Sequence, residues 1–170
     1  MDLEKLVTQV DENDNVIGLQ PKSKFNDGKL IHRSSYLLLL NSKGELLLQK
    51  RALSKKWHPG KWTFPVAGTV GDETYEDCIR REIREAFGKV MNFKTLFKYR
   101  HFDKVDKAFK MVFLAKAEAN EITFNKNYSA NHAWIAINEL EEEINNSEKY
   151  APPFIAGMKI VFKKNLLKHP

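Results

Sequence analysis

The chain has 170 residues, of which 42% are hydrophobic and 29% are charged. These proportions are those of an ordinary globular protein, which excludes a disordered, fibrous or disulfide-scaffold chain. The net charge of +6 favours an anionic partner such as a phosphate, a nucleotide or a nucleic acid, with a charge that only aids solubility as the alternative. At 19.7 kDa, we expect one domain over residues 1–170.

The cysteine content and the N-terminal residues indicate where the protein works. Cys78 is the single cysteine, so an internal disulfide is excluded, and its place among apolar helix residues predicts a buried side chain. No charged and apolar segments in the order of a signal peptide are found at the start, and the aliphatic run at 37–40 is too short to cross a bilayer. We therefore expect a cytoplasmic protein without a membrane span.

The first part of the chain predicts β-structure. Leu6–Val10 and Val16–Leu19 flank a polar turn, which predicts a hairpin that, with its polar connection, fills residues 1–33. Tyr36–Leu40 and Glu45–Gln49 predict a second hairpin. Because consecutive leucines suit a strand that is covered on both faces, this hairpin is expected in the core.

The middle of the chain predicts a short strand and then a helix. Residues 61–66 are expected to form the strand. Apolar residues recur at helical spacing over Thr74–Phe87, and Gly88 provides the stop. In such a helix Glu82 and Glu85 share one face.

The second half of the chain predicts further strands and two helices. Strands are expected at Phe93–Phe102, Ala108–Ala117 and His132–Ile137, with a helix as the alternative for 109–116. Asn138 and Glu141 have the spacing of a helix cap and its partner. A last amphipathic helix is expected over about 153–167.

Two blocks of this sequence, Pro65–Glu73 and Arg81–Gly88, have a spacing that resembles the Nudix box, G-x5-E-x7-R-E-U-x-E-E-x-G-U with U apolar. The residues at their expected places are Glu73, Arg81, Glu82, Ile83, Glu85 and Gly88. Three positions depart from the pattern: Ala67 replaces the first Gly, Ala86 the second Glu of the pair, and Lys89 the final apolar residue. The resemblance implies an α/β fold, the Nudix α/β/α sandwich with a mixed β-sheet, in which 67–89 form the box loop and helix.

The resemblance also implies a metal site made by Glu82 and Glu85. Mg²⁺, with Mn²⁺ as the alternative, is bound by one or two carboxylates plus water and substrate phosphates. In the family the Glu that Ala86 replaces is usually a direct ligand, so a backbone carbonyl at Ala67 or Gly68 and the diphosphate itself would complete the coordination. Glu85 is either a ligand or the base that activates water.

The resemblance gives Glu73 and Arg81 a supporting role. They are expected to pair and to hold the loop against the helix.

A second segment, Gln49–Thr63, resembles the region before the box in isopentenyl-diphosphate isomerases, which share the Nudix fold. In those enzymes, the residues that match Lys22, Arg51 and Lys55 contact diphosphate oxygens. Flexible cations suit that task, and a solvated surface cation is the alternative for each of them.

The isomerase chemistry itself is not expected here. Ala67 stands where the isomerases have a catalytic Cys, Thr69 stands where they have a metal-binding His, and no Glu occurs in 106–110. Protonation of an alkene needs an acid and a base, and an alanine cannot supply either. His32, without that metal partner, is expected to be a hydrogen-bonded structural residue.

The sequence therefore predicts a metal-dependent Nudix pyrophosphohydrolase. Its expected partner is a small-molecule diphosphate, a nucleoside diphosphate derivative or a similar compound. A catalytically impaired Nudix domain that binds nucleotide or RNA is the first alternative, because Ala86 removes a carboxylate and the net charge is positive. Isopentenyl-diphosphate isomerase is the second, and the oligomeric state is left open.

Overall fold

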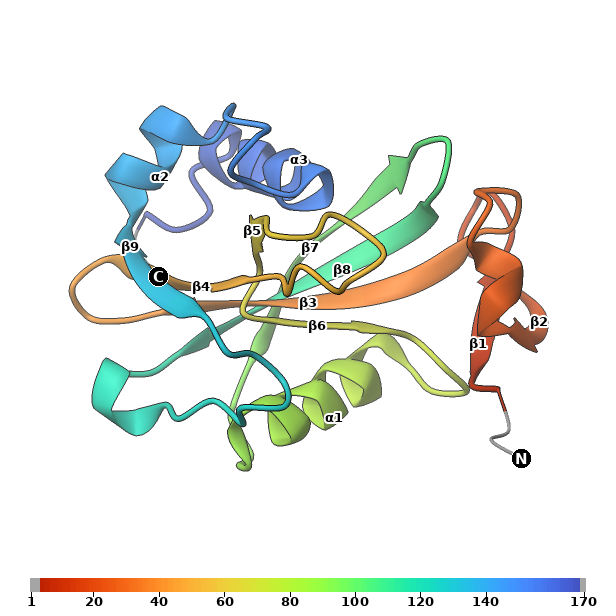
Figure 1. Cartoon of the computed structure of the whole chain (residues 1–170), viewed down its shortest axis with the longest axis horizontal. Helices are drawn as coiled ribbons and strands as arrows, with labels where there is room; N and C mark the ends of the chain where they lie inside the picture. Colours follow the sequence, from red (N-terminus) through yellow and green to blue (C-terminus); the bar gives the residue numbers. More distant parts are fainter. Residues whose placement is uncertain (1–3, 169–170) are drawn as a thin grey trace.

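The computed structural model describes residues 4–168 and shows a mixed β-sheet with α1 against one face and α2 and α3 on the other (Figure 1). The strands are β1 (Leu6–Val10), β2 (Val16–Pro21), β3 (His32–Leu40), β4 (Glu45–Lys50), β5 (Trp62–Thr63), β6 (Val66–Thr69), β7 (Lys94–Phe102), β8 (Lys107–Lys116) and β9 (His132–Ala136). The helices are α1 (Tyr75–Phe87), α2 (Ile137–Glu143) and α3 (Pro152–Lys163), with short 3-10 turns η1 (Lys22–Phe25) and η2 (Ala119–Glu121). This arrangement confirms the α/β sandwich with a mixed sheet.

Strand β3 is the centre of the sheet. It pairs in parallel with β8 from His32 to Leu40, and β7 continues the sheet antiparallel to β8. On its other edge, β3 pairs with β6 over Ser34–Leu37 and with β4 only at Leu40. The predicted second hairpin is therefore closed only beside its turn, because β6 takes the remaining edge of β3.

The strand expected at 61–66 is two strands. β5 pairs with β4, and β6 pairs with β3, so the chain changes neighbours between Thr63 and Val66. Pro65 lies at this change, where its missing N–H removes one donor from the ladder. The division opens the sheet between β4 and β6.

The leucine run of β3 is covered on both faces, as predicted. Leu37 and Leu39 pack in the core cluster that includes α1, and Leu38 and Leu40 pack in the cluster that includes α3. Alternate residues of a strand point to opposite faces, so one strand supplies both halves of the core. Cys78 is fully buried in the α1 cluster, as expected.

Helix α1 begins and ends where the sequence predicts. The Thr74 side chain accepts a hydrogen bond from Asp77 N at 3.1 Å, and Gly88 ends the helix in the left-handed conformation with φ +66°. The start of this helix fixes the rotation that directs Glu82 toward the sheet.

The other two helices depart from expectation at their ends. The cap predicted at Asn138 is wrong: α2 begins after Ala136 without a side-chain cap, because the Gly44 carbonyl accepts from Ile137 N at 3.1 Å. Helix α3 ends at Lys163, before the predicted 167, and Asn165 takes a left-handed φ of +52°. Within residues 4–168, no helix is both long enough and apolar enough to span a membrane.

The predicted N-terminal hairpin, β1–β2, is present and is anchored by a buried carboxylate in its turn. Asp14 accepts hydrogen bonds from Arg33 Nε at 2.7 Å, Lys98 Nζ at 2.7 Å and Tyr75 Oη at 2.9 Å. Burial acts to raise the pKa of Asp14, but these hydrogen bonds outweigh it and hold the pKa below its ordinary value. One side chain thus joins the hairpin to β3, β7 and α1.

We predict that Asp14→Asn destabilises the protein by about 3 kcal/mol, because the change leaves Arg33 and Lys98 without a buried counter-charge. Asparagine tolerates the left-handed φ of +64° at this position, so backbone strain does not contribute. Urea unfolding measures the difference.

The depressed pKa also fixes the pH dependence of this contribution. The advantage of wild type over Asp14→Asn should be full above about pH 4 and should decline as the pH falls through the lower folded pKa. A difference that is constant between pH 7 and pH 2 would contradict this role.

Candidate active site

A cleft of about 430 Å³ opens above β3 and β6, between the N-terminal hairpin and the loop that follows β4. Many of the residues singled out from the sequence line it: Lys22, Arg51, Lys55, Ala67, Gly68 and Glu82. Residues this far apart in the chain meet because β6 pairs with β3, α1 packs on these strands, and the β1–β2 hairpin lies at their end. The structure therefore brings the expected phosphate-binding cations and Glu82 of the box to one place.

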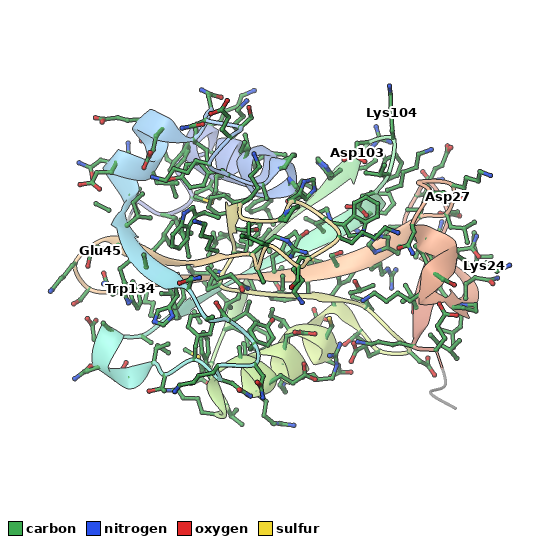
Figure 2. The ribbon with its side chains drawn as sticks, in the orientation of Figure 1. Lys24, Asp27, Glu45, Asp103, Lys104 and Trp134 are labelled. Carbon is green, nitrogen blue, oxygen red and sulfur yellow. The ribbon has the colours of Figure 1, made fainter. Side chains whose placement is uncertain are left out.

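One end of the cleft is closed by two turns. Figure 2 shows Asp27 of the connection after β2 at the same end of the molecule as Lys104 of the β7–β8 turn. A Cβ on Gly28 would lie 2.5 Å from the Lys104 carbonyl oxygen, so the two turns touch through a position that only glycine can fill. Phe25 and Val105 line the cleft beside this contact.

The Glu82 carboxylate reaches the cleft by lying against the backbone of β6. Its residue is only 7% exposed, although it is a charged side chain on a helix. A Cβ on Gly68 would lie 2.5 Å from Glu82 Cγ and from Oε1. Gly68 is thus required for this approach, and it sets the position of the carboxylate.

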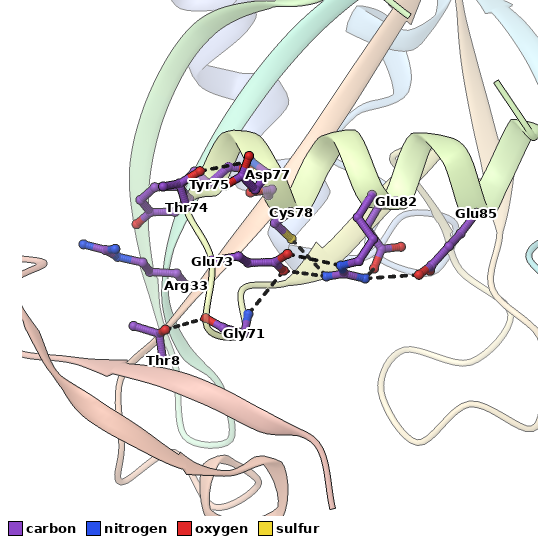
Figure 3. A network of polar contacts seen from close by, with 12 residues as sticks. Thr8, Arg33, Gly71, Glu73, Thr74, Tyr75, Asp77, Cys78, Glu82 and Glu85 are labelled. Carbon is purple, nitrogen blue, oxygen red and sulfur yellow. Dashed lines mark hydrogen bonds and ion pairs between the residues drawn. The ribbon is translucent and has the colours of Figure 1, made fainter. Parts of the chain in front are cut away.

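Arg81 joins the three box glutamates (Figure 3). Its Nη2 and Nε donate to the two oxygens of Glu73 at 2.6 and 3.2 Å, which forms a bidentate pair. Its Nη1 donates to Glu82 Oε1 at 2.9 Å and to Glu85 Oε1 at 3.4 Å. The expected pairing of Glu73 with Arg81 is confirmed.

Glu85 occupies a different environment from Glu82. Its side chain is 53% exposed, and it is not among the cleft residues. It reaches the site through the Arg81 guanidinium that also holds Glu82. The structure therefore places one glutamate in the cleft and one at the rim.

The pKa values of the Glu82 and Glu73 carboxyls shift in opposite directions. Burial raises the pKa of Glu82, and the charge of Glu85 adds to the rise, against hydrogen bonds from Tyr128 and Arg81. Burial also acts on Glu73, but the hydrogen bond from Arg81 outweighs it and lowers the pKa of Glu73. Glu73 is a stable anionic anchor, whereas Glu82 is a carboxyl that a nearby cation would hold in its ionised form.

The cations in the cleft repel one another. Partial desolvation lowers the pKa of Lys22, and the charges of Lys5 and Lys55 lower it further, against the attraction of Glu82. Arg51 is half-buried and donates from Nε to the Trp57 carbonyl at 2.7 Å. A polyanion such as a diphosphate would relieve this repulsion. Lys5 was not predicted, because an isolated lysine before a strand carries no signal.

The carboxylate oxygens of Glu82 and Glu85 are donors of the kind that a hard divalent cation prefers. Among residues 4–168, no three His, Cys, Asp or Glu side chains gather closely enough to hold a metal by themselves. Ala86 is fully buried in the core and supplies no carboxylate. Mg²⁺ accepts one or two carboxylates when water and phosphates supply the rest, so Glu82 and Glu85 would suffice as its protein ligands.

A buried charged network forms another part of the cleft wall. Asp106 Oδ1 lies 2.7 Å from His32 Nε2, and Asp106 Oδ2 accepts from Lys110 Nζ at 3.2 Å. Lys110 is 2% exposed and also donates to Tyr36 Oη at 2.9 Å. Burial acts to raise the pKa of Asp106, but the hydrogen bond with His32 and the charge of Lys110 hold it well below its usual range.

This network confirms that His32 is a hydrogen-bonded residue. The sequence carries a signal for the rest of this network, because Lys110 is a charged residue inside an apolar strand, between Phe109 and Met111. A charge in such a place needs a partner, which is the half-buried Asp106.

Comparison with known proteins identifies the protein family to which this site belongs. A family model of the NUDIX domain matches residues 30–156. The chain belongs to the Nudix family, and the expected class, a Nudix hydrolase, is confirmed.

Individual proteins extend the likeness over almost the whole chain. The sequence is 33% identical to a prenyl-diphosphate phosphatase of Methanosarcina mazei over 168 residues, covering 96% of this chain and 99% of that one. It is 31% identical to isopentenyl-diphosphate Delta-isomerase 1 of Photorhabdus laumondii over 157 residues, 87% of this chain and 89% of that one. A crystal structure of a Deinococcus radiodurans protein has the same fold, with a TM-score of 0.77 at 22% identity over 92% of this chain and 98% of that one.

We predict that Asp106→Asn costs about 3 kcal/mol or more of folding stability, because it leaves buried Lys110 without its counter-charge. Lys110→Met should cost clearly less, since the pair of Asp106 with His32 remains and the methionine fills a similar volume. Denaturant unfolding of both variants measures the order, and equal or reversed losses would contradict the sharing of Asp106 by Lys110 and His32.

Proposed function

We propose that the chain is a divalent-metal-dependent Nudix hydrolase that cleaves the diphosphate of a small organic molecule, with a prenyl diphosphate as its substrate. The observation that carries the proposal is the shared cleft. The Glu82 carboxylate lies in the same cleft as Lys22, Arg51 and Lys55. Such a cleft can bind a diphosphate with its cations and place it beside the Glu82 carboxylate.

Each residue has a distinct part in this reaction. Lys22, Arg51 and Lys55 bind the diphosphate oxygens and orient them, and Glu82 and Glu85 would hold Mg²⁺ or Mn²⁺. When bound, the metal supplies charge stabilisation and lowers the pKa of a water molecule.

In the chemical step, water adds to a phosphorus and the bridging P–O bond breaks. The products are the organic monophosphate and inorganic phosphate. Glu85, at the exposed rim, is the ligand or the base that receives the proton of the water.

The choice of substrate rests on the Methanosarcina mazei relative and on the walls of the cleft. That relative is named a prenyl-diphosphate phosphatase, and the match covers nearly all of both chains. Phe25, Tyr36 and Trp57 line the cleft and offer apolar surface for a hydrocarbon tail. The same rings would stack on a base, so a nucleoside diphosphate derivative is the competing substrate.

Isomerase activity is disfavoured by the cleft. Ala67 and Thr69 line it at the positions where the isomerases have their catalytic Cys and metal-binding His. Neither side chain can protonate an alkene.

We predict that Glu82→Gln and Glu85→Gln each lower kcat by about 100-fold or more, the scale of a lost acid-base or charge-stabilising group. Phosphate release from isopentenyl and geranyl diphosphates, measured with Mg²⁺, with Mn²⁺ and with EDTA, provides the readout. EDTA should abolish turnover. Glu76→Gln, an exposed change on the same helix, is the control and should retain wild-type activity. Full activity in both site variants would refute the assignment.

We further predict that Lys22→Gln raises KM for the diphosphate by about tenfold with little change in kcat, because a charge-assisted contact to phosphate is lost. Lys24→Gln, an exposed change in the same turn outside the cleft, is the matched control. Steady-state kinetics at fixed ionic strength separates the two parameters. An unchanged KM would show that Lys22 is a solvated surface cation.

A further inference from the structure

Tyr128, on the loop between η2 and β9, contacts both parts of the box site. Its Oη lies 2.8 Å from Glu82 Oε2. The same oxygen accepts from Ala67 N at 3.1 Å and lies 3.0 Å from Ala67 O. One hydroxyl group therefore connects the carboxylate of α1 to the backbone of β6.

The loop that carries Tyr128 is docked on the last turn of α1. Asn125 N donates to the Ala86 carbonyl at 2.7 Å, and the Asn125 carbonyl accepts from Tyr128 N at 2.9 Å. The Phe124 ring packs against Phe87 with 4.9 Å between centroids. These contacts fix the backbone of the loop at Tyr128 relative to α1. The position of the Tyr128 hydroxyl is therefore set by the helix.

The two oxygens of Glu82 are restrained by different partners. Oε1 accepts from Arg81 Nη1 at 2.9 Å, and Oε2 lies beside Tyr128 Oη. Because Ala67 N donates to the phenol oxygen, the hydroxyl hydrogen is left for an acceptor, and an ionised carboxylate is a stronger acceptor than the Ala67 carbonyl. Arg81 and Tyr128 together fix the orientation of the carboxylate plane.

We propose that Tyr128 is a positioning residue that holds Glu82 in the orientation needed to bind the metal. This inference rests on the proposed function. At Ala86 the box position that normally carries a second Glu is buried beneath the docked loop, and the loop supplies a phenol beside Glu82 instead. The chain thus restrains one carboxylate from two sides where a second carboxylate is missing.

The direct test is Mn²⁺ binding to the full chain, measured by electron paramagnetic resonance of the free ion. Tyr128→Phe removes the hydroxyl and keeps the ring that packs beside α1. We expect its Mn²⁺ affinity to fall by about 3- to 10-fold, as for the loss of one residue that orients a metal ligand. Tyr150→Phe is the matched control, because Tyr150 Oη also donates to a carboxylate, Glu143 at 3.0 Å, but lies outside the cleft.

Turnover and thermal unfolding separate positioning from general stability. For Tyr128→Phe, kcat should fall by about tenfold while KM for the diphosphate stays within about 3-fold. Both tyrosine variants should melt close to wild type, and only Tyr128→Phe should lose Mn²⁺ affinity. An unchanged Mn²⁺ affinity in Tyr128→Phe overturns the proposal, whatever its turnover. A wild-type chain that binds no Mn²⁺ even with inorganic pyrophosphate present overturns the proposed function as well, which distinguishes the two failures.

Discussion

The close approach of the Glu82 carboxylate to the backbone of β6 at Gly68 is the contact on which the site depends. A charged group lies almost fully buried between a helix and a strand because the strand has no side chain at that point. Burial of a charge is costly unless it has hydrogen-bond partners. Arg81 and Tyr128 each form a hydrogen bond with one oxygen of the Glu82 carboxylate. The result is a carboxylate with little freedom, placed beside a cleft lined by cations.

Buried ion pairs organise the rest of the molecule around that cleft. Asp14 joins the N-terminal hairpin to the sheet, and the hairpin brings Lys5 to one wall and connects to Lys22. Asp106 contacts Lys110 of β8 and His32 of β3, which form another wall. Such pairs add little net stability over apolar packing, but losing one partner is costly. Their value here lies in fixing the cleft walls.

The sequence predicted those features that depend on local spacing. Helix α1, its stop at Gly88 and the leucine strand follow from local periodicity, the Glu73–Arg81 pair follows from the box pattern, and all are present. The division of the β3 edge between β4 and β6 depends on which of the two strands forms backbone hydrogen bonds with each part of β3. Local sequence does not determine that choice. Tyr128 lies 46 residues from Glu82 in an irregular loop, so no local pattern places it there. The predicted cap at Asn138 is wrong because the carbonyl of Gly44, in a turn distant in the sequence, accepts the hydrogen bond from Ile137 N at the start of α2.

The most direct measurement of the central claim is ³¹P nuclear magnetic resonance of the purified chain incubated with Mg²⁺ and either geranyl diphosphate or a nucleoside diphosphate. The account predicts that the paired diphosphate resonances of the prenyl compound disappear, and that resonances of a monoester and of inorganic phosphate replace them in equal amounts. Persistence of the diphosphate resonances in both samples, with the chain still folded, would contradict it. Conversion of the nucleoside diphosphate alone would keep the hydrolase and overturn the prenyl substrate.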